Sequence, residues 1–216
     1  MNSYTPSNAS KVVCVGRNYA EHARELNNPI PSEPVLFIKP NTSICPFAGD
    51  IQIPKQYGEV HHELEIALVI GKQLTHATHE QALNAISGIG LALDLTLRDI
   101  QTQLKGKQHS WEKAKCFDNA CPIECIPFEA TESDISELSL RLLINGKTRQ
   151  QGDTGLMLFK PLELIVYISQ WFTLLPGDIV LTGTPAGVNS LQVNDELEST
   201  LHINDKECLK VVSKII

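Results

Sequence analysis

The strongest constraint on the fold is an Asn-Gly pair at 145–146, which stands between two runs of strand-forming residues, 138–144 and 148–151. Asn-Gly suits the positive φ angles of a type I′ turn, and this turn joins neighbouring antiparallel strands. An Asn-Asp pair at 204–205 marks a second hairpin near the end of the chain. These signals predict a fold in which antiparallel sheet is a major component.

Residue spacing predicts the other elements. Apolar and β-branched runs indicate strands at residues 11–15, 34–39, 63–70 and 179–182. Helical spacing indicates helices at residues 18–26, 78–86 and 161–171. Because helices and strands do not alternate regularly, we expect a mixed α+β, mainly β fold and not a doubly wound sheet. A single domain over residues 1–216, with a polar arm at 1–10, is the simplest organisation.

Composition argues against several kinds of partner. The formal net charge of -7 and the pI near 5.5 disfavour nucleic acid, because phosphate binding needs clustered Lys and Arg. The sequence contains no apolar run of roughly 18 residues, the length that a membrane-spanning helix needs. The first ten residues lack the basic and apolar regions of a secretory signal. We therefore expect a cytoplasmic protein with reduced cysteines and no membrane partner.

Two glutamates interrupt an otherwise apolar strand. Glu63 and Glu65 are two residues apart, so on a strand their side chains point to the same face. Two carboxylates at that distance raise each other's pKa unless a cation neutralises them. The alternative is that the strand begins at the surface and that water solvates both glutamates. The HExxH zinc motif is absent, since Ile66 occupies the position of its second histidine.

Asp94 is a third carboxylate, within the apolar run 91–97. A buried aspartate needs a partner, although capping of the following turn is a structural alternative. Together with the two glutamates it would form an all-oxygen site, which favours Mg²⁺, Mn²⁺ or Ca²⁺ over Zn²⁺. Lys115 is a candidate to balance the excess negative charge, although a lone lysine is more often at the surface. A zinc site of Cys116, Cys121 and Cys125 is disfavoured, because the spacing does not fit one.

His22 and Glu25 form a second candidate constellation. On a helix they share a face, so the carboxylate can fix the tautomer of the imidazole, as in a general base that activates water. The alternative is an exposed and inert pair. Arg17, beside a glycine turn, is a candidate to bind a carboxylate through two hydrogen bonds. The backbone of loop 183–188 could meet an anion, but a plain tight turn is the simpler interpretation because the loop lacks P-loop spacing.

The motifs occur in an order that resembles the fumarylacetoacetate hydrolase family. They are Gly-Arg-Asn-Tyr-x-x-His-x-x-Glu at 16–25, Val-Leu-Phe-Ile-Lys-Pro at 35–40, His-His-Glu-Leu-Glu at 61–65, Leu-Asp-Leu-Thr-x-Arg-Asp-x-Gln at 93–101, Ala-Lys-x-Phe-Asp at 114–118 and Pro-Gly-Asp-x-x-Leu-Thr-Gly-Thr-Pro-x-Gly-Val at 176–188. The chain is most similar to short, single-domain bacterial members that resemble acylpyruvate hydrolases and oxaloacetate decarboxylases. Asn189 and the pair 194–195 depart from the family pattern, in a late turn only.

This resemblance implies a fold, a cofactor and roles for residues. The family has a mixed β-sandwich or roll fold and forms homodimers, and residues 18–34 correspond to its lid. One Mg²⁺ or Mn²⁺ ion per chain would be held by Glu63, Glu65 and Asp94. The resemblance places the catalytic roles on His22, Glu25 and Lys115. It places the substrate contacts on Arg17, Asn18, Gln101 and Thr184.

The family's chemistry implies a small 2-keto or 2,4-dioxo acid as substrate. In the expected reaction, His22 activates water, and C–C cleavage of an acylpyruvate leaves a metal-bound pyruvate enolate. Decarboxylation or tautomerisation of oxaloacetate at the same site is the alternative, and isomerisation or decarboxylation of longer dioic acids from aromatic catabolism is a further one. Hydrolysis is preferred because both His22 and Glu25 are present. A catalytically idle binding protein is disfavoured, because the complete site is retained.

Overall fold

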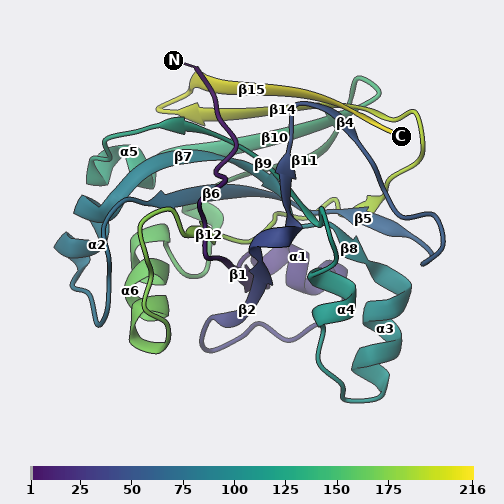
Figure 1. Ribbon diagram of the computed structural model, residues 1–216, viewed down its shortest axis with the longest axis horizontal. Helices are drawn as coiled ribbons and strands as arrows, with labels where there is room; N and C mark the ends of the chain where they lie inside the picture. The colour runs from purple at the N-terminus through teal and green to yellow at the C-terminus, as the bar shows by residue number, and fades with distance from the viewer. Residues whose placement is uncertain (1) are drawn as a thin grey trace.

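The computed structural model describes residues 2–216, and strands predominate (Figure 1). The strands are β1 (Lys11–Gly16), β2 (Val35–Pro40), β3 (Ile44–Pro46), β4 (Gly49–Ile51), β5 (Val60–His62), β6 (Leu64–Ile70), β7 (Ile86–Leu93), β8 (Thr96–Leu97), β9 (Cys121–Pro127), β10 (Leu138–Ile144), β11 (Lys147–Asp153), β12 (Ile179–Leu181), β13 (Asn189–Ser190), β14 (Glu196–Ile203) and β15 (Lys206–Ile215). The helices are α1 (Ala20–Glu25), α2 (His79–Ala85), α3 (Arg98–Gly106), α4 (Glu112–Lys115), α5 (Glu132–Ser136) and α6 (Pro161–Trp171), with 3₁₀ turns η1 (Asn41–Ser43) and η2 (Thr154–Leu156).

A seven-stranded sheet with the order β2-β1-β12-β6-β7-β9-β3 forms the centre of the molecule. β1 runs parallel to β12 and antiparallel to β2, while β6 is antiparallel to both β12 and β7. All seven residues of β6 are buried, which explains its continuous apolar sequence. Its neighbours hold β6 firmly in register, and the two glutamates of the predicted site lie at its start.

A five-stranded sheet with the order β11-β10-β14-β15-β4 lies over the first sheet. Buried and exposed residues alternate along β10 and β15, as expected for a sheet with one solvated face. The φ angles of Asn145 (52°) and Gly146 (73°) confirm the predicted tight turn between β10 and β11. Asn204 and Asp205 likewise have positive φ angles, in the hairpin between β14 and β15.

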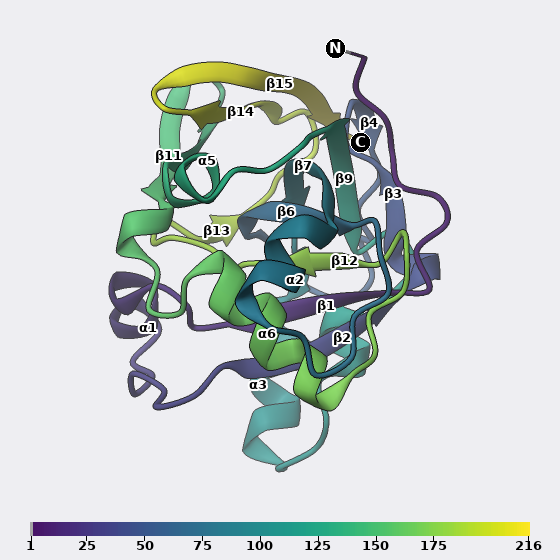
Figure 2. The same cartoon turned by 90° about the vertical axis from the view of Figure 1, so that its left-hand side faces the viewer.

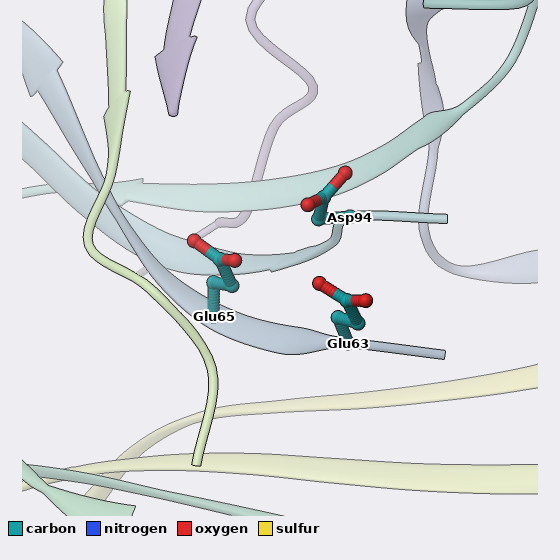
Figure 3. A group of neighbouring side chains, drawn as sticks. All are labelled: Glu63, Glu65 and Asp94. Atoms are coloured by element: carbon teal, nitrogen blue, oxygen red, sulfur yellow. The ribbon is translucent and has the colours of Figure 1, made fainter. Parts of the chain in front are cut away.

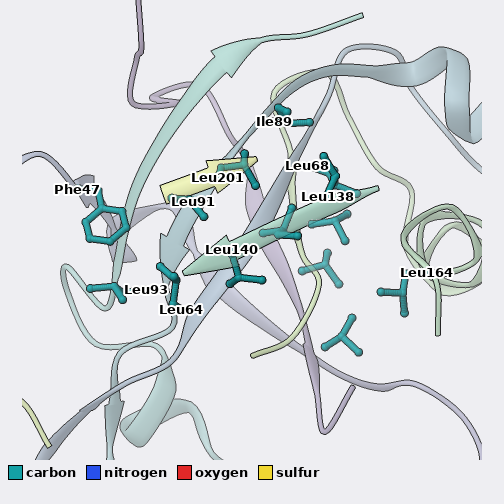
Figure 4. Close-up of a cluster of buried hydrophobic side chains, with 14 of the residues drawn as sticks. Phe47, Leu64, Leu68, Ile89, Leu91, Leu93, Leu138, Leu140, Leu164 and Leu201 are labelled. Atoms are coloured by element: carbon teal, nitrogen blue, oxygen red, sulfur yellow. The ribbon is translucent and has the colours of Figure 1, made fainter. Parts of the chain in front are cut away.

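The main core lies between these two sheets. Leucine and isoleucine side chains of β6 and β7 face those of β10 and β14 (Figure 4). The buried residues drawn there include Leu64, Leu68, Ile89, Leu91, Leu138, Leu140 and Leu201. Burial of this apolar surface is the main favourable contribution to folding. Two packed sheets with few helices confirm the predicted mixed, mainly β fold.

The polar arm predicted at residues 1–10 packs against the outer face of the seven-stranded sheet. The Tyr4 N–H donates to the Cys125 carbonyl at 2.8 Å, and the Cys125 N–H donates back at 2.9 Å. Ala9 is also buried, among side chains of β1, β9 and β12. The segment therefore adds a single bridge beside β9, and Tyr4 and Ala9 cover part of the second face of the sheet, whereas Met1 lies outside the described residues.

The predicted helices at 78–86 and 161–171 are confirmed as α2 and α6, which lie side by side (Figure 2). α1 is shorter than the predicted helix at 18–26, because the chain is still extended at Tyr19. α3, α4, α5 and β9 were not predicted. α3 buries only Gln101, so its apolar spacing is weak, and the prolines at both ends of β9 disguise a strand.

None of the helices between residues 2 and 216 is long and apolar enough to cross a membrane. All six cysteines are free thiols, as expected from their scattered positions in the sequence.

Candidate metal centre and active site

Three carboxylates meet at the place where β6 begins and β7 ends. Glu63 lies in the break between β5 and β6, Glu65 lies on β6, and Asp94 directly follows β7. The two strands are antiparallel, and the Asp94 N–H donates to the Glu63 carbonyl at 2.8 Å, so the three side chains share one location. Each offers a carboxylate oxygen within 4.8 Å of the others, and the three side chains gather in one place (Figure 3). The structure thus brings together the residues that the sequence assigns to a metal ion.

All three carboxylates are buried. The exposed fractions are 5% for Glu63, 2% for Glu65 and 1% for Asp94, so the alternative of solvated surface glutamates is wrong. The capping alternative for Asp94 is also wrong, because α3 begins after Leu97 and has no side-chain cap. Burial of an ionised carboxylate is costly unless a cation compensates it.

Two cations compensate part of this charge. Lys115, the last residue of α4, donates from Nζ to Glu63 Oε2 at 2.9 Å and to Asp94 Oδ2 at 2.5 Å. It also donates to the Thr96 hydroxyl at 2.6 Å. Arg98, at the start of α3, donates to Glu63 Oε1 at 2.5 Å. Lys115 therefore lies at the site as predicted from the resemblance, whereas Arg98 was not singled out although it belongs to the motif at 93–101.

Lys39 is a third cation, which sequence reasoning missed. It lies on β2 and is fully buried, and its Nζ is 2.8 Å from Asp94 Oδ1, although outside hydrogen-bonding geometry. The ammonium also donates to the main-chain carbonyls of Leu95 and Lys115. A signal existed in the sequence, because a lysine that follows four apolar residues on a strand needs a buried partner.

Glu65 differs from its neighbours because no Lys, Arg or His nitrogen of the described chain lies within 4.0 Å of its carboxylate. It accepts one hydrogen bond, from the Gly183 N–H at 2.7 Å. Burial, followed by the charges of Asp94 and Glu63, raises the pKa of Glu65 well above its usual value. Burial acts in the same direction on Glu63, but Lys115 and Arg98 outweigh it and hold the pKa of Glu63 below its usual value.

This donor set fits a hard divalent cation. Carboxylate oxygens are the preferred ligands of Mg²⁺ and Mn²⁺. The positive charge of such an ion would compensate Glu65, which has no cationic partner among the described residues. Glu63, Glu65 and Asp94 would hold such an ion.

His22 and Glu25 pair on α1, in the predicted lid. The imidazole Nδ1 donates to Glu25 Oε2 at 3.1 Å, so both side chains share a helix face as predicted. His22 is 5% exposed and lines the same pocket as the three carboxylates. The second oxygen of Glu25 accepts a hydrogen bond from the Gly187 N–H at 3.0 Å. The pair is therefore held over the site, and the exposed alternative is wrong for His22.

Loop 183–188 supplies backbone N–H groups to the chain's own carboxylates. Gly183 and Gly187 have φ angles of +96° and +100°, which favour glycine. A Cβ atom on Gly187 would approach the Arg149 carbonyl oxygen to 1.9 Å, so this position has no space for any side chain. Sequence reasoning preferred a plain tight turn over contact with an anion, but two N–H groups of this loop donate to anionic groups of the chain itself, Glu65 and Glu25.

Gln150, on β11, is a further residue that sequence reasoning missed. Its Oε1 accepts hydrogen bonds from the Leu64 N–H at 3.0 Å and from His62 Nδ1 at 2.9 Å. Its amide nitrogen donates to the Thr184 hydroxyl at 2.7 Å and to the Pro185 carbonyl at 2.9 Å. Gln150 thus joins the start of β6 to loop 183–188. No motif marks it, because its partners are far away along the chain.

Three of the four predicted substrate contacts line the pocket with the carboxylates, namely Arg17, Gln101 and Thr184. Asn18 is placed differently. Its amide nitrogen donates to the carbonyls of Thr182 and Phe159, and its oxygen accepts from the Phe159 N–H. These bonds fix the first residue of the predicted lid, and contact between Asn18 and substrate stays a prediction.

Comparison with known proteins agrees with this geometry. The sequence model of the fumarylacetoacetate (FAA) hydrolase C-terminal domain matches residues 11–211. The chain belongs to the fumarylacetoacetate hydrolase family. The oxaloacetate tautomerase YcgM of Escherichia coli is 52% identical over 192 residues, which cover 88% of each chain. The mitochondrial oxaloacetate tautomerase FAHD1 of Homo sapiens is 42% identical over 191 residues, covering 88% of this chain and 86% of that protein.

Family members of known structure have the same fold. The fumarylpyruvate hydrolase of Pseudomonas aeruginosa, solved in complex with Mn²⁺ and pyruvate, superposes with a TM-score of 0.87 at 30% identity, covering 96% of this chain and 90% of that one. A fumarylacetoacetate isomerase/hydrolase-like protein from Oleispira antarctica has a TM-score of 0.95 at 53% identity, with 98% and 95% covered. The chain is therefore an enzyme of this family, as the sequence motifs indicated.

Proposed function

We propose that the protein is a divalent-metal-dependent oxaloacetate tautomerase, which interconverts the enol and keto forms of this 2-keto acid. The observation that carries the metal dependence concerns Glu65. This carboxylate is buried beside Glu63 and Asp94, and no cation of the described chain neutralises Glu65 itself. The choice of reaction is supported by two relatives that carry this activity in their names and align over 88% of the chain. The sequence motifs favoured hydrolysis, and the names of the relatives favour its alternative.

An Mg²⁺ or Mn²⁺ ion on Glu63, Glu65 and Asp94 would supply Lewis acidity that stabilises negative charge on the keto oxygen of the substrate. Lys115, with its ammonium between Glu63 and Asp94, would add a positive charge at the same place. Phe37 and Trp111 form part of the pocket wall and pack edge to face, with ring centroids 6.3 Å apart.

His22 would move the proton that the reaction requires. Its Nδ1–H is bound to Glu25, so the other ring nitrogen is left as the base. In the keto to enol direction this nitrogen takes a proton from C3 of oxaloacetate, and the C–H electrons form the C2–C3 double bond. The C2=O π electrons move to the oxygen, and the imidazolium gives the proton back to it. The Gly187 N–H keeps the Glu25 carboxylate in place through this step.

Hydrolysis of acylpyruvates is a second candidate, favoured by the same pair, since a histidine oriented by a carboxylate can also activate water. The Pseudomonas relative, a fumarylpyruvate hydrolase, supports it at 30% identity. Decarboxylation of oxaloacetate, the third possible reaction, needs neither an attacking water nor proton removal from C3. Its rate therefore serves as a reference for the two reactions that would use His22 as a base.

The test compares the three reactions on one preparation with Mg²⁺ or Mn²⁺. Ketonisation of enol-oxaloacetate is followed by ultraviolet absorbance, beside acetylpyruvate cleavage and oxaloacetate decarboxylation. We expect ketonisation to be the fastest. If acetylpyruvate were cleaved rapidly while ketonisation stayed at the solution rate, the tautomerase proposal would be wrong and hydrolysis would replace it.

Two variants assign the roles of the residues. His22→Ala is expected to lower ketonisation or hydrolysis by roughly two to four orders of magnitude, the usual contribution of a positioned acid–base group, and to lower decarboxylation far less. Glu63→Ala, which removes a proposed metal ligand, should abolish all three reactions. Equal losses of all reactions in His22→Ala would mean that His22 only closes the lid or binds substrate.

The resemblance also supports a homodimer, which we propose here. Light scattering at micromolar concentration that returned the 23.9 kDa of one chain would contradict it.

A further inference from the structure

Four cationic side chains line the pocket, but only two of them have carboxylate partners. Arg98 and Lys115 are paired with the three-carboxylate cluster. The side chains of Arg17 and Lys105 have no carboxylate within 4.0 Å among residues 2–216 and donate none of the side-chain hydrogen bonds found there. Both are only partly exposed. Two half-buried cations in one pocket, each more than 4.0 Å from every carboxylate of residues 2–216, mark a place for an anion that comes from outside.

Lys105 is held against the pocket wall. It lies on α3, and its Nζ is 5.3 Å from the centre of the Trp111 ring, a distance at which the ring face attracts a cation. Burial, and then the charges of Arg17, Arg98 and Lys115, lower the pKa of Lys105. These cations therefore lie close enough together to repel one another, and a bound anion would relieve the repulsion.

Arg17 has an uncommon backbone conformation. Its φ angle is 60°, in the left-handed region that non-glycine residues rarely adopt. The next residue, Asn18, is fixed by three hydrogen bonds to the segments at Phe159 and Thr182. The surrounding structure thus imposes the conformation of Arg17 and directs its side chain to the pocket, as is typical of strained residues at functional sites.

We propose that Arg17 and Lys105 form a subsite for the second carboxylate of a dicarboxylic 2-keto acid. The inference rests on the proposed function, in which the reacting end of the substrate lies at the Glu63, Glu65 and Asp94 cluster. Oxaloacetate carries its second charge on C4, whereas an acylpyruvate with a neutral tail would leave both cations without a partner. The subsite selects substrates with a charged distal end.

The test uses oxaloacetate and its 4-methyl ester, in which a methyl group replaces the negative charge of the distal carboxylate. Trp111 lines the pocket, and Trp171, the other tryptophan, lies on α6 with 67% of its surface exposed. In a Trp171→Phe background, tryptophan fluorescence therefore reports binding at the pocket, in the presence of Mg²⁺. Dissociation constants for both ligands are measured in this background and after the further changes Lys105→Met, Arg17→Met and, as a matched control, Lys107→Met. Lys107 is exposed beyond the end of α3 and does not line the pocket.

We expect the reference protein to bind oxaloacetate roughly ten- to a hundredfold more tightly than the ester, the usual contribution of a hydrogen bond between charged groups. Lys105→Met and Arg17→Met should each reduce this preference about tenfold, and Lys107→Met should leave it as it was. Equal binding of both ligands, or a preference that survives both substitutions, would overturn the subsite. Because the fluorescence titration reports binding and does not depend on catalysis, a protein that prefers oxaloacetate but fails to ketonise it would contradict the proposed function and leave the subsite standing.

Discussion

Asp178 and Glu65 lie beyond opposite ends of the paired stretch of β12 and β6. Both are nearly inaccessible to solvent, with exposed fractions of 0% and 2%. Asp178 precedes β12 and accepts hydrogen bonds from the N–H groups of Ser10, Lys11 and Leu175 and from the Ser10 hydroxyl. The Lys11 ammonium lies 2.5 Å from its second oxygen. Glu65 has a single N–H donor, from Gly183, and two carboxylate neighbours.

The difference separates a structural carboxylate from a functional one. The hydrogen bonds and the ion pair of Asp178 join the N-terminal segment to the turn before β12, so its charge stabilises the fold without any ligand. Among residues 2–216 Glu65 has no comparable set of partners, and a buried carboxyl group whose pKa is strongly raised in this way is typical of a binding site. Changes of each carboxylate to its amide keep the shape and test the distinction directly.

The largest expected effect is on activity, in Glu65→Gln. Metal-dependent turnover should fall by about 10²–10⁴-fold, because Lewis-acid stabilisation contributes several kcal/mol and each 1.36 kcal/mol is a factor of ten. The melting temperature should not fall, since an amide oxygen still accepts from Gly183 and the repulsion with Asp94 is removed. Steady-state kinetics and thermal melts of the metal-free protein check both points. Wild-type turnover in this variant would remove Glu65 from the metal site.

Asp178→Asn should show the opposite result. An amide accepts fewer of the five donors and leaves the Lys11 ammonium without its counter-ion, so we expect the free energy of unfolding to decrease by about 2–4 kcal/mol. Turnover per folded molecule should stay at the wild-type value. Urea denaturation and active-site titration measure the two quantities. Unchanged stability would show that the hydrogen bonds of Asp178 are replaceable.

Added metal should stabilise only proteins with an intact cluster. At a concentration of one hundred times the dissociation constant, Mg²⁺ or Mn²⁺ should stabilise the wild type by about 2.7 kcal/mol, or roughly 5–10 °C in melting temperature. Asp178→Asn should gain a similar increment from its lower starting point, and Glu65→Gln should gain almost none. An equal gain in Glu65→Gln would place the ion elsewhere.

The smallest expected effect is a dependence on pH. Burial acts to raise the pKa of Asp178, but the Leu175 N–H, Lys11 and Ser10 outweigh it and hold the pKa below the ordinary value of 3.8. A carboxyl whose pKa is lowered on folding stabilises the protein fully above its unfolded pKa and loses this contribution as the pH falls through the folded value. The stability difference between wild type and Asp178→Asn should therefore be constant from pH 7 to 5 and shrink below about pH 4. A constant difference down to pH 2 would contradict this origin.

The two carboxylates also show what sequence reasoning can reach. The pairing of Glu63 with Glu65 follows from the two-residue period of a strand, and that of His22 with Glu25 follows from the helical period, so both were predictable from local spacing. Asp94 stood out because apolar residues surround it. Asp178, in contrast, was not singled out although it belongs to the motif at 176–188, because its donors Ser10 and Lys11 lie far away along the chain.

The same limit applies within the site. Lys39 approaches Asp94 from β2, and Gln150 reaches Leu64 from another sheet, and neither contact has a period in the sequence. The unpredicted α3 follows the same logic, since its position depends on packing against α4 and β8 and not on a strong apolar stripe of its own. Long-range contacts of this kind become visible only when the fold is known.

The position of β12 also determines when the site can form during synthesis of the chain. β12 separates β1 from β6 in the sheet, although it is made long after both of them. β1 and β6 therefore emerge from the ribosome before the strand that joins them has been made. The sheet is completed only when β12 pairs with both of them, late in synthesis and over a long separation in sequence. The N–H donors of Gly183 and Gly187 follow β12 and arrive later still. A nascent chain that ends before Gly183 would carry all three proposed metal ligands and the His22–Glu25 pair, but it would lack the groups that hold Glu65 and Glu25 in position.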